Sequence, residues 1–373
     1  MTDSAADPRQ PVAKNTNRRG AVKRVRAQSY LLWTLVALAT SVIVTRTYLQ
    51  LTGYPQIGGG DLHIAHAIWG GLLLYIAALV PLIFANNRAL VVSAILNGVG
   101  AGLFIDEIGK FLTRTNDYFY PPAAPLVYSF FLLSVLLYFL VRKARPNNPR
   151  AELFRGLELL QDLVDGNLEQ DGVQRLRAQM DTAAAASDPA IAQLGDTLGV
   201  YLKRFGDDLE STRPDWLHRM DLRVEGIGRR VGRRTHRIVI LVLLLWGSLL
   251  ALLNVALLVL YAVAPTFLNQ DLASVLVTEG ELRSLADWPW FITRLILEGA
   301  AGILTIAAAI LLLMRRELQA IKIAIFAVVL SLTTVVLLTF YIDQFGAMYG
   351  ALLEFLILLI LISYQRWYLE EPA

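Results

Sequence analysis

The chain has 373 residues, of which 55% are apolar and 17% charged, and its formal net charge is +3. It contains no cysteine, which excludes disulfide bonds, thiolate metal sites and a cysteine nucleophile. The apolar residues are concentrated in long runs between strongly charged stretches, a pattern that excludes an ordinary soluble domain and a transmembrane β-barrel.

Eight apolar runs are long enough to cross a bilayer as helices. They cover residues 29–50, 62–84, 89–111, 124–142, 238–264, 290–314, 319–341 and 346–365. The sequence therefore predicts an all-α membrane protein with eight transmembrane helices.

The chain begins with a polar, basic segment. Residues 1–27 contain few large apolar side chains, so we expect a disordered cytoplasmic tail that orients the protein and touches the lipid surface. No aromatic residues are interleaved with its basic residues, and we expect no nucleic-acid partner. Residues 28–142 then form the first four-helix membrane half.

A soluble insertion, residues 143–237, separates the fourth and fifth spans. The stretch from Arg145 to Pro149 breaks the chain and caps a new helix, and Asp188-Pro189 has the same form. Leucines and valines recur at helical spacing after residue 150, which predicts a small cytoplasmic helical domain. Such a domain would bind a cytoplasmic protein partner.

Five arginines precede the fifth span directly. A juxtamembrane basic cluster of this kind is expected to contact anionic lipid headgroups. These residues are Arg229, Arg230, Arg233, Arg234 and Arg237.

The second membrane half, residues 238–368, precedes a short tail at 369–373. Its segment FYIDQFGAM (340–348) repeats part of GVGAGLFIDEIGKF (98–111) without a gap. The matching pairs are Ile105/Ile342, Asp106/Asp343 and Gly109/Gly346. Both segments end the third span of their half, so we predict two parallel four-helix halves related by an internal repeat.

The block GVGAGLFIDEIGKF resembles a pattern of uncharacterised prokaryotic multi-pass membrane proteins. The resemblance extends over about residues 60–125. It implies a prokaryotic membrane protein and carries no activity with it.

Lysine and arginine gather on one side of the predicted spans. The tail, the insertion and the segments at Arg88, Arg315-Arg316 and Arg366 share that side, while the opposite loops hold few basic residues, among them Arg46. The positive-inside rule therefore predicts cytoplasmic N- and C-termini, in a bacterial inner membrane.

Ionisable side chains inside membrane helices indicate functional sites. Helix rise places most of those in this chain near the outer boundary of the bilayer, on helix faces that also carry small residues. The candidates for a substrate or ion site are Asp106, Glu107, Lys110, Arg294, Glu298, Asp343, Gln344 and Glu354.

Two other interpretations of these residues stay open. Asp106 with Lys110, and Arg294 with Glu298, have the i,i+4 spacing of pairs that neutralise each other on one helix. Alternatively, His63 and His66, at i,i+3, would bind a divalent metal ion together with Asp106.

Three functions fit this pattern. The first is a proton- or cation-coupled transporter with a polar site near the outer leaflet. The second is a membrane sensor or scaffold that signals through the inserted helical domain. The third is an intramembrane metal-dependent hydrolase acting on lipid. The chain carries no recognisable kinase, cyclase or nucleotide-binding signature, and the first two, non-enzymatic functions are favoured.

Overall fold

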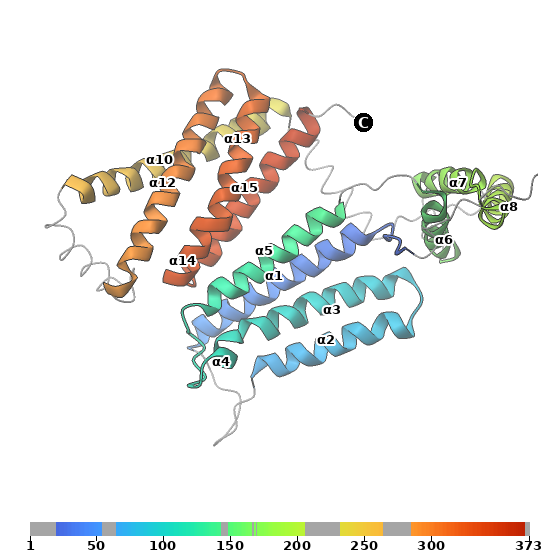
Figure 1. The fold of residues 1–373 in the computed structure, drawn as a ribbon, viewed down its shortest axis with the longest axis horizontal. Helices are drawn as coiled ribbons and strands as arrows, with labels where there is room; N and C mark the ends of the chain where they lie inside the picture. Colours follow the sequence, from blue (N-terminus) through green and yellow to red (C-terminus); the bar gives the residue numbers. More distant parts are fainter. Residues whose placement is uncertain are drawn as a thin grey trace, which may run out of the picture. The chain divides into compact units, whose positions relative to one another are not determined.

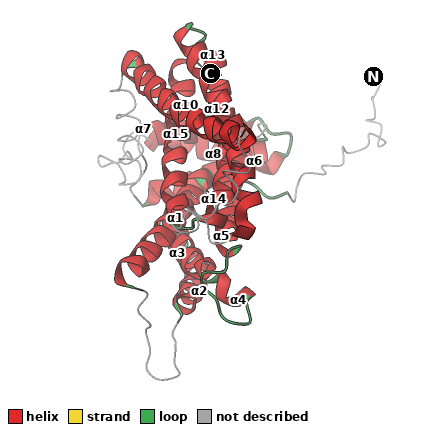
Figure 2. Ribbon diagram, turned by 90° about the vertical axis from the view of Figure 1, so that its left-hand side faces the viewer, coloured by secondary structure: helices red, strands yellow, loops and turns green. Residues whose placement is uncertain are grey.

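The computed structural model describes residues 20–53, 65–142, 148–165, 168, 170–205, 232–263 and 285–369. Every regular element in these residues is a helix (Figure 2). Eight helical segments in this part of the chain are at least 18 residues long and apolar enough to cross a membrane. The chain is therefore a polytopic helical membrane protein, as the apolar runs predict.

The eight spans coincide with the eight predicted runs to within a few residues (Figure 1). The first four are α1 (Ala27–Thr52), α2 (His66–Ile83), α3 (Asn87–Asp106) and α5 (Ala123–Arg142), and the short α4 (Ile108–Leu112) follows α3. The last four are α10 (Arg233–Val263), α12 (Trp288–Leu313), a composite seventh span and α15 (Gly346–Tyr368). The seventh span consists of α13 (Glu317–Leu330), the π-helical turn η2 (Ser331–Val335) and α14 (Val336–Ile342).

Small residues bring α1, α2 and α3 into close contact. A Cβ added at Gly98 would lie 2.6 Å from the Cβ of Ala37 on α1, and one added at Gly70 would lie 2.7 Å from the carbonyl oxygen of Gly100. The hydroxyl of Ser41 donates to the carbonyl of Val99 across the α1–α3 interface, at 3.2 Å. Without a hydrophobic driving force in lipid, such close backbone packing holds membrane helices together.

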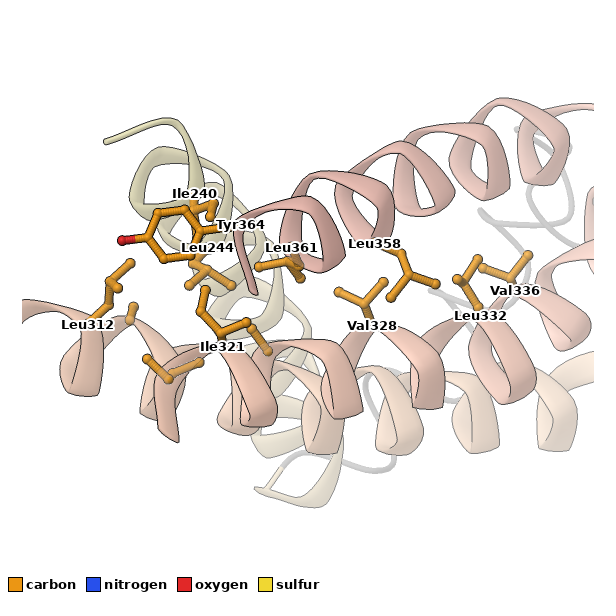
Figure 3. Close-up of a cluster of buried hydrophobic side chains, with 14 of the residues drawn as sticks. Ile240, Leu244, Leu312, Ile321, Val328, Leu332, Val336, Leu358, Leu361 and Tyr364 are labelled. Carbon is orange, nitrogen blue, oxygen red and sulfur yellow. The ribbon is translucent and has the colours of Figure 1, made fainter. Parts of the chain in front are cut away.

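The helices α10, α12, α13 and α15 enclose a continuous apolar core (Figure 3). Ile321 and Leu361 are fully buried in it, and Tyr364 closes one end of the cluster. The core extends along the seventh span through Leu332 and Val336.

The first and last four spans meet at α5 and the seventh span. The ring of Tyr128 stacks on Phe340 with centroids 4.7 Å apart, and its hydroxyl donates to the carbonyl of Leu332 at 2.8 Å. Leu332 lies in η2, where the i→i+5 pattern disturbs the regular hydrogen-bond ladder. A buried side-chain donor thus satisfies a backbone acceptor of the π-helical turn.

A second compact unit contains α6 (Pro149–Val164), α7 (Gln170–Ala184) and α8 (Pro189–Phe205). Its core includes Leu176, Met180 and Leu202. The caps at the start of α6 and α8 form as predicted: the side-chain oxygen Oδ1 of Asn148 accepts from the Arg150 N–H, and the Asp188 carboxylate accepts from the Ala190 N–H. Arg229 and Arg230, which are predicted to contact lipid headgroups, lie outside the described residues.

The helical unit also includes residues 20–30 and 85–89, and therefore the first residues of α1 and α3. Asp162 on α6 accepts a hydrogen bond from the Asn87 side chain at 2.9 Å and lies 3.3 Å from the guanidinium of Arg26. The N–H of Val25 donates to Glu158 at 2.9 Å. The end of the predicted basic tail therefore has defined contacts with α6.

Candidate functional site

The candidate site forms where α3 ends. The helix stops at Asp106, Glu107 has φ −87° and ψ 9°, and α4 begins at Ile108. This turn sends two adjacent carboxylates to different neighbours. Both are almost completely buried, at 1% exposure each.

Asp106 is held by three side chains. Its Oδ1 accepts from the Nε of Arg46 on α1 at 2.5 Å, and its Oδ2 accepts from the Tyr118 hydroxyl at 2.7 Å. The Nε2 of His66 lies 3.3 Å from the same Oδ2. Arg46 is itself only 3% exposed, so the pair is a buried ion pair whose charges depend on each other.

Glu107 joins α2 to α4. Its Oε1 accepts from the Nζ of Lys110 at 2.5 Å, and its Oε2 from the N–H of Ala67 at 3.0 Å. Ala65, the N-cap residue of α2, offers no side-chain acceptor, so the Glu107 carboxylate serves as the cap from another helix. Negative charge at a helix N-terminus is also favoured by the helix dipole.

His66 and Tyr118 connect the two carboxylates. The Nδ1 of His66 lies 3.8 Å from Glu107 Oε1, while its Nε2 faces Asp106. The Nζ of Lys110 lies 5.6 Å from the centre of the Tyr118 ring, within cation–π range. The side chains of His66 and Lys110 are each 22% exposed.

The charges of this group, which we call the Asp106 cluster, balance. Its members are Arg46, His66, Asp106, Glu107, Lys110 and Tyr118. Two carboxylates face one guanidinium and one ammonium, so the net charge is zero when His66 is neutral. The cluster therefore holds one end of α1, α2 and α3 together.

The predicted pairing of Asp106 with Lys110 is wrong. Because α3 ends at Asp106, the i,i+4 geometry is lost and Lys110 contacts Glu107 instead. The stripe of Gly98, Gly102 and Asp106 does face one neighbour, α1. The predicted pair of Arg294 with Glu298 is present, with Nε and Oε2 3.6 Å apart.

Sequence reasoning missed two members of the cluster. It counted Arg46 with the basic residues of an outer loop, although the first predicted run, 29–50, contains it; in the structure α1 continues to Thr52 and the Arg46 side chain is buried. It did not include Tyr118 among the candidates, although the hydroxyl of this residue donates to Asp106. The available signal was a lone arginine six residues inside an apolar helix, which requires a counter-ion.

A second polar group lies around Glu354 on α15. The hydroxyl of Ser331, the first residue of η2, donates to its Oε1 at 2.9 Å. Its Oε2 is buried with no hydrogen-bond partner among the described residues, and none of them supplies a cation within ion-pair distance. Glu298 on α12 lies within electrostatic range.

The echoed aspartate has a different environment from Asp106. Asp343 is exposed, and its Oδ1 accepts from the N–H groups of Phe345 and Gly346, both at 3.0 Å, at the start of α15. The adjacent Gln344 is buried and points its Nε2 toward the carbonyl of Phe119, 3.5 Å away. Asp106 and Asp343 therefore both lie at the end of the third span of their half, but they bind different groups.

Among the described residues, no three His, Asp or Glu side chains are grouped so that they could hold a metal ion. His63 lies outside these residues, so the predicted set of His63, His66 and Asp106 stays a prediction. In the part of the set that is described, both oxygens of Asp106 already have partners.

Of the arginines predicted to contact lipid, Arg233 and Arg237 pair with Glu317, while Arg234 is exposed. Comparison of the chain with family models, curated proteins and solved structures finds no match. The class of protein, a multi-pass helical membrane protein with buried ionisable groups, therefore follows from the fold and the site alone.

Proposed function

We propose that this protein is a proton- or cation-coupled membrane transporter whose ion-binding carboxylate is Glu354. The observation that carries the proposal is a carboxyl group inside a membrane span that has no cationic partner among the described residues. The Asp106 cluster, in which each carboxylate contacts a basic side chain, would close one end of the first spans.

The depth of Glu354 fits such a role. Twelve residues of α15 separate it from Arg366, which corresponds to about 18 Å of α-helix in a hydrocarbon core of about 30 Å. A permanent negative charge at this depth is costly in free energy. The Glu354 carboxyl group would therefore bind and release a proton or a cation, which it exchanges with water or substrate in the transport pathway.

The π-helical turn supports the same reading. Single π-helical turns within α-helices are frequent at functional sites, and η2 presents Ser331 directly to Glu354. A change in the protonation of Glu354 would alter its bond with Ser331. The seventh span is therefore the element that would move during transport.

Reconstitution into liposomes tests the proposal. With a pH-sensitive dye inside and a potassium diffusion potential imposed, we expect proton uptake that falls at least tenfold in Glu354→Gln. Glu298→Gln should reduce it less, and the exposed Asp181→Asn in the helical unit, the matched control, should leave it unchanged. Wild-type rates in Glu354→Gln, or a wild-type protein that responds to neither proton nor sodium gradients, would contradict the proposal.

A second function, sensing through the helical unit, is favoured by the contacts of Asp162. This residue binds both Arg26 and Asn87, so α6 touches the starts of two membrane helices that meet again at Arg46 and Asp106. If the protein is a sensor, deletion of residues 150–225 should abolish its cellular phenotype and leave ion flux intact. An unchanged phenotype would exclude this role.

We also propose, from the distribution of lysine and arginine and from the echoed motif, that both termini are cytoplasmic in a bacterial inner membrane. The two four-helix halves would then be parallel repeats, with residues 143–237 inserted between them.

A further inference from the structure

Glu317 fastens one end of the last four spans. The carboxylate accepts from Arg233 on α10 at 2.8 Å and from the hydroxyl of Tyr364 on α15 at 2.8 Å. Arg237 contributes a third contact at 3.3 Å and also donates to the carbonyl of Leu312 at 3.0 Å. These bonds bring the starts of α10 and α13, the end of α12 and the end of α15 to one place.

Three more arginines are close in sequence to the residues of this contact. Arg315 and Arg316 form the turn between α12 and α13, directly before Glu317, and Arg234 lies between the two arginines that Glu317 binds. All three are exposed, and none has a carboxylate partner among the described residues. Arg315 has a φ of 63°, a conformation that directs the turn at some energetic cost. Two guanidinium groups therefore share the Glu317 carboxylate, and the other three have no carboxylate partner among the described residues.

Aromatic rings mark the depth of this group. His236 on α10 is surrounded by Tyr364, Trp367 and Tyr368 on α15, with ring centroids 5.2 to 5.9 Å away. Tyrosine and tryptophan at helix ends are characteristic of the headgroup level of a bilayer. The three exposed arginines hence lie where lipid phosphates lie.

We propose that Arg234, Arg315 and Arg316 form a binding site for the headgroup of an anionic glycerophospholipid. Glu317 pairs with both Arg233 and Arg237 and fixes the helix ends, and the guanidinium groups of the other three arginines are available to a phosphodiester. The headgroup of a zwitterionic lipid has no net charge and would not balance the positive charge of these arginines. The site is independent of Glu354 and of its role in transport.

Lipid-dependent stability tests the site in the full-length protein. In nanodiscs of phosphatidylcholine, addition of phosphatidylglycerol should raise the Tm of the wild type, and native mass spectrometry should show retained phosphatidylglycerol. Each replacement of an arginine by glutamine should lower the affinity for phosphatidylglycerol about fivefold. The triple variant Arg234→Gln, Arg315→Gln, Arg316→Gln should therefore lose the Tm increase. Arg114→Gln, an exposed arginine after α4, is the matched control and should keep it.

Three outcomes would overturn the proposal. The first is a full Tm increase in the triple variant, and the second is equal stability of the wild type in phosphatidylcholine alone. The third is replacement of the lipid by inorganic phosphate, which would show that the site takes free anions. Proton flux in the triple variant with Glu354 intact separates this result from a failure of the transport proposal.

Discussion

At the scale of single residues, the environment of Asp106 contrasts most with what its sequence neighbours indicate. Lys110 stands four positions away, yet the counter-ion comes from Arg46, 60 residues earlier. The reason is that α3 ends at Asp106, whereas the i,i+4 spacing rule assumes that the helix continues to Lys110. An ion pair between two buried groups is sensitive to the loss of either partner.

We therefore expect Asp106→Asn to destabilise the protein by about 3–5 kcal/mol, because the buried Arg46 would lose the charge of the carboxylate that it contacts at 2.5 Å. Thermal unfolding in detergent measures the effect. The double variant Arg46→Met, Asp106→Leu should recover much of the loss, since it removes both charges.

Asp343→Asn is the natural control for that experiment. This side chain is exposed and accepts hydrogen bonds only at the start of α15, so its replacement by another good cap should cost well under 1 kcal/mol. Equal losses from the two substitutions would mean that burial of the Arg46–Asp106 pair is not the dominant contribution.

At the scale of elements, small residues determine how closely α1 and α3 approach. The backbone of α1 lies against Gly98, so an added methyl group would meet the Cβ of Ala37 at 2.6 Å and the amide nitrogen of Leu38 at 2.9 Å. Gly71 on α2 has no atom within 4 Å of the equivalent position. The two glycines share a residue type and differ in their surroundings.

Gly98→Ala should accordingly lower the free energy of unfolding by about 1–3 kcal/mol through overpacking. Gly71→Ala should be neutral or slightly stabilising, because alanine is the better helix former and meets no neighbour. Unfolding in a denaturing detergent series compares them directly. A neutral Gly98→Ala would show that α1 and α3 do not pack as closely as the structure places them.

The elements also show what sequence reasoning can and cannot reach. Apolar runs predict all eight spans, and the spacing of Gly98, Gly102 and Asp106 predicts a small-residue face of α3 that points into the bundle; in the structure this face meets α1. The turn at Glu107 and the π-helical turn η2 could not be predicted, because both depend on tertiary partners such as Ala67 and Tyr128. Helix depth places most of the ionisable side chains in one layer near the outer boundary of the bilayer. Their tertiary partners instead divide them into separate groups, among them one around Asp106 and one around Glu354.

At the scale of the whole molecule, the absence of cysteine offers a direct test of the proposed orientation. The eight spans would place Arg114, after α4, on the outer side and Asp181, in the helical unit, in the cytoplasm. Single cysteines at these positions introduce the only thiols of the chain, so any labelling reports one site.

A membrane-impermeant maleimide should label Arg114→Cys in intact cells and should label Asp181→Cys only after permeabilisation. The reverse pattern would invert the topology, and labelling of both from outside would rule out cytoplasmic placement of the helical unit. A mass shift of the purified protein quantifies each reaction.

The pairing of Arg46 with Asp106 also has a consequence for biosynthesis. At a synthesis rate of roughly 5–20 residues per second, the 60 residues between them take about 3–12 s, during which Arg46 has entered the membrane machinery and its partner does not yet exist. A long arginine side chain near a helix end can meanwhile reach the bilayer surface. The first span would therefore be stably inserted only after the third span has been synthesised and Asp106 can pair with Arg46. Nascent chains that stop before residue 106 should accordingly remain extractable from the membrane.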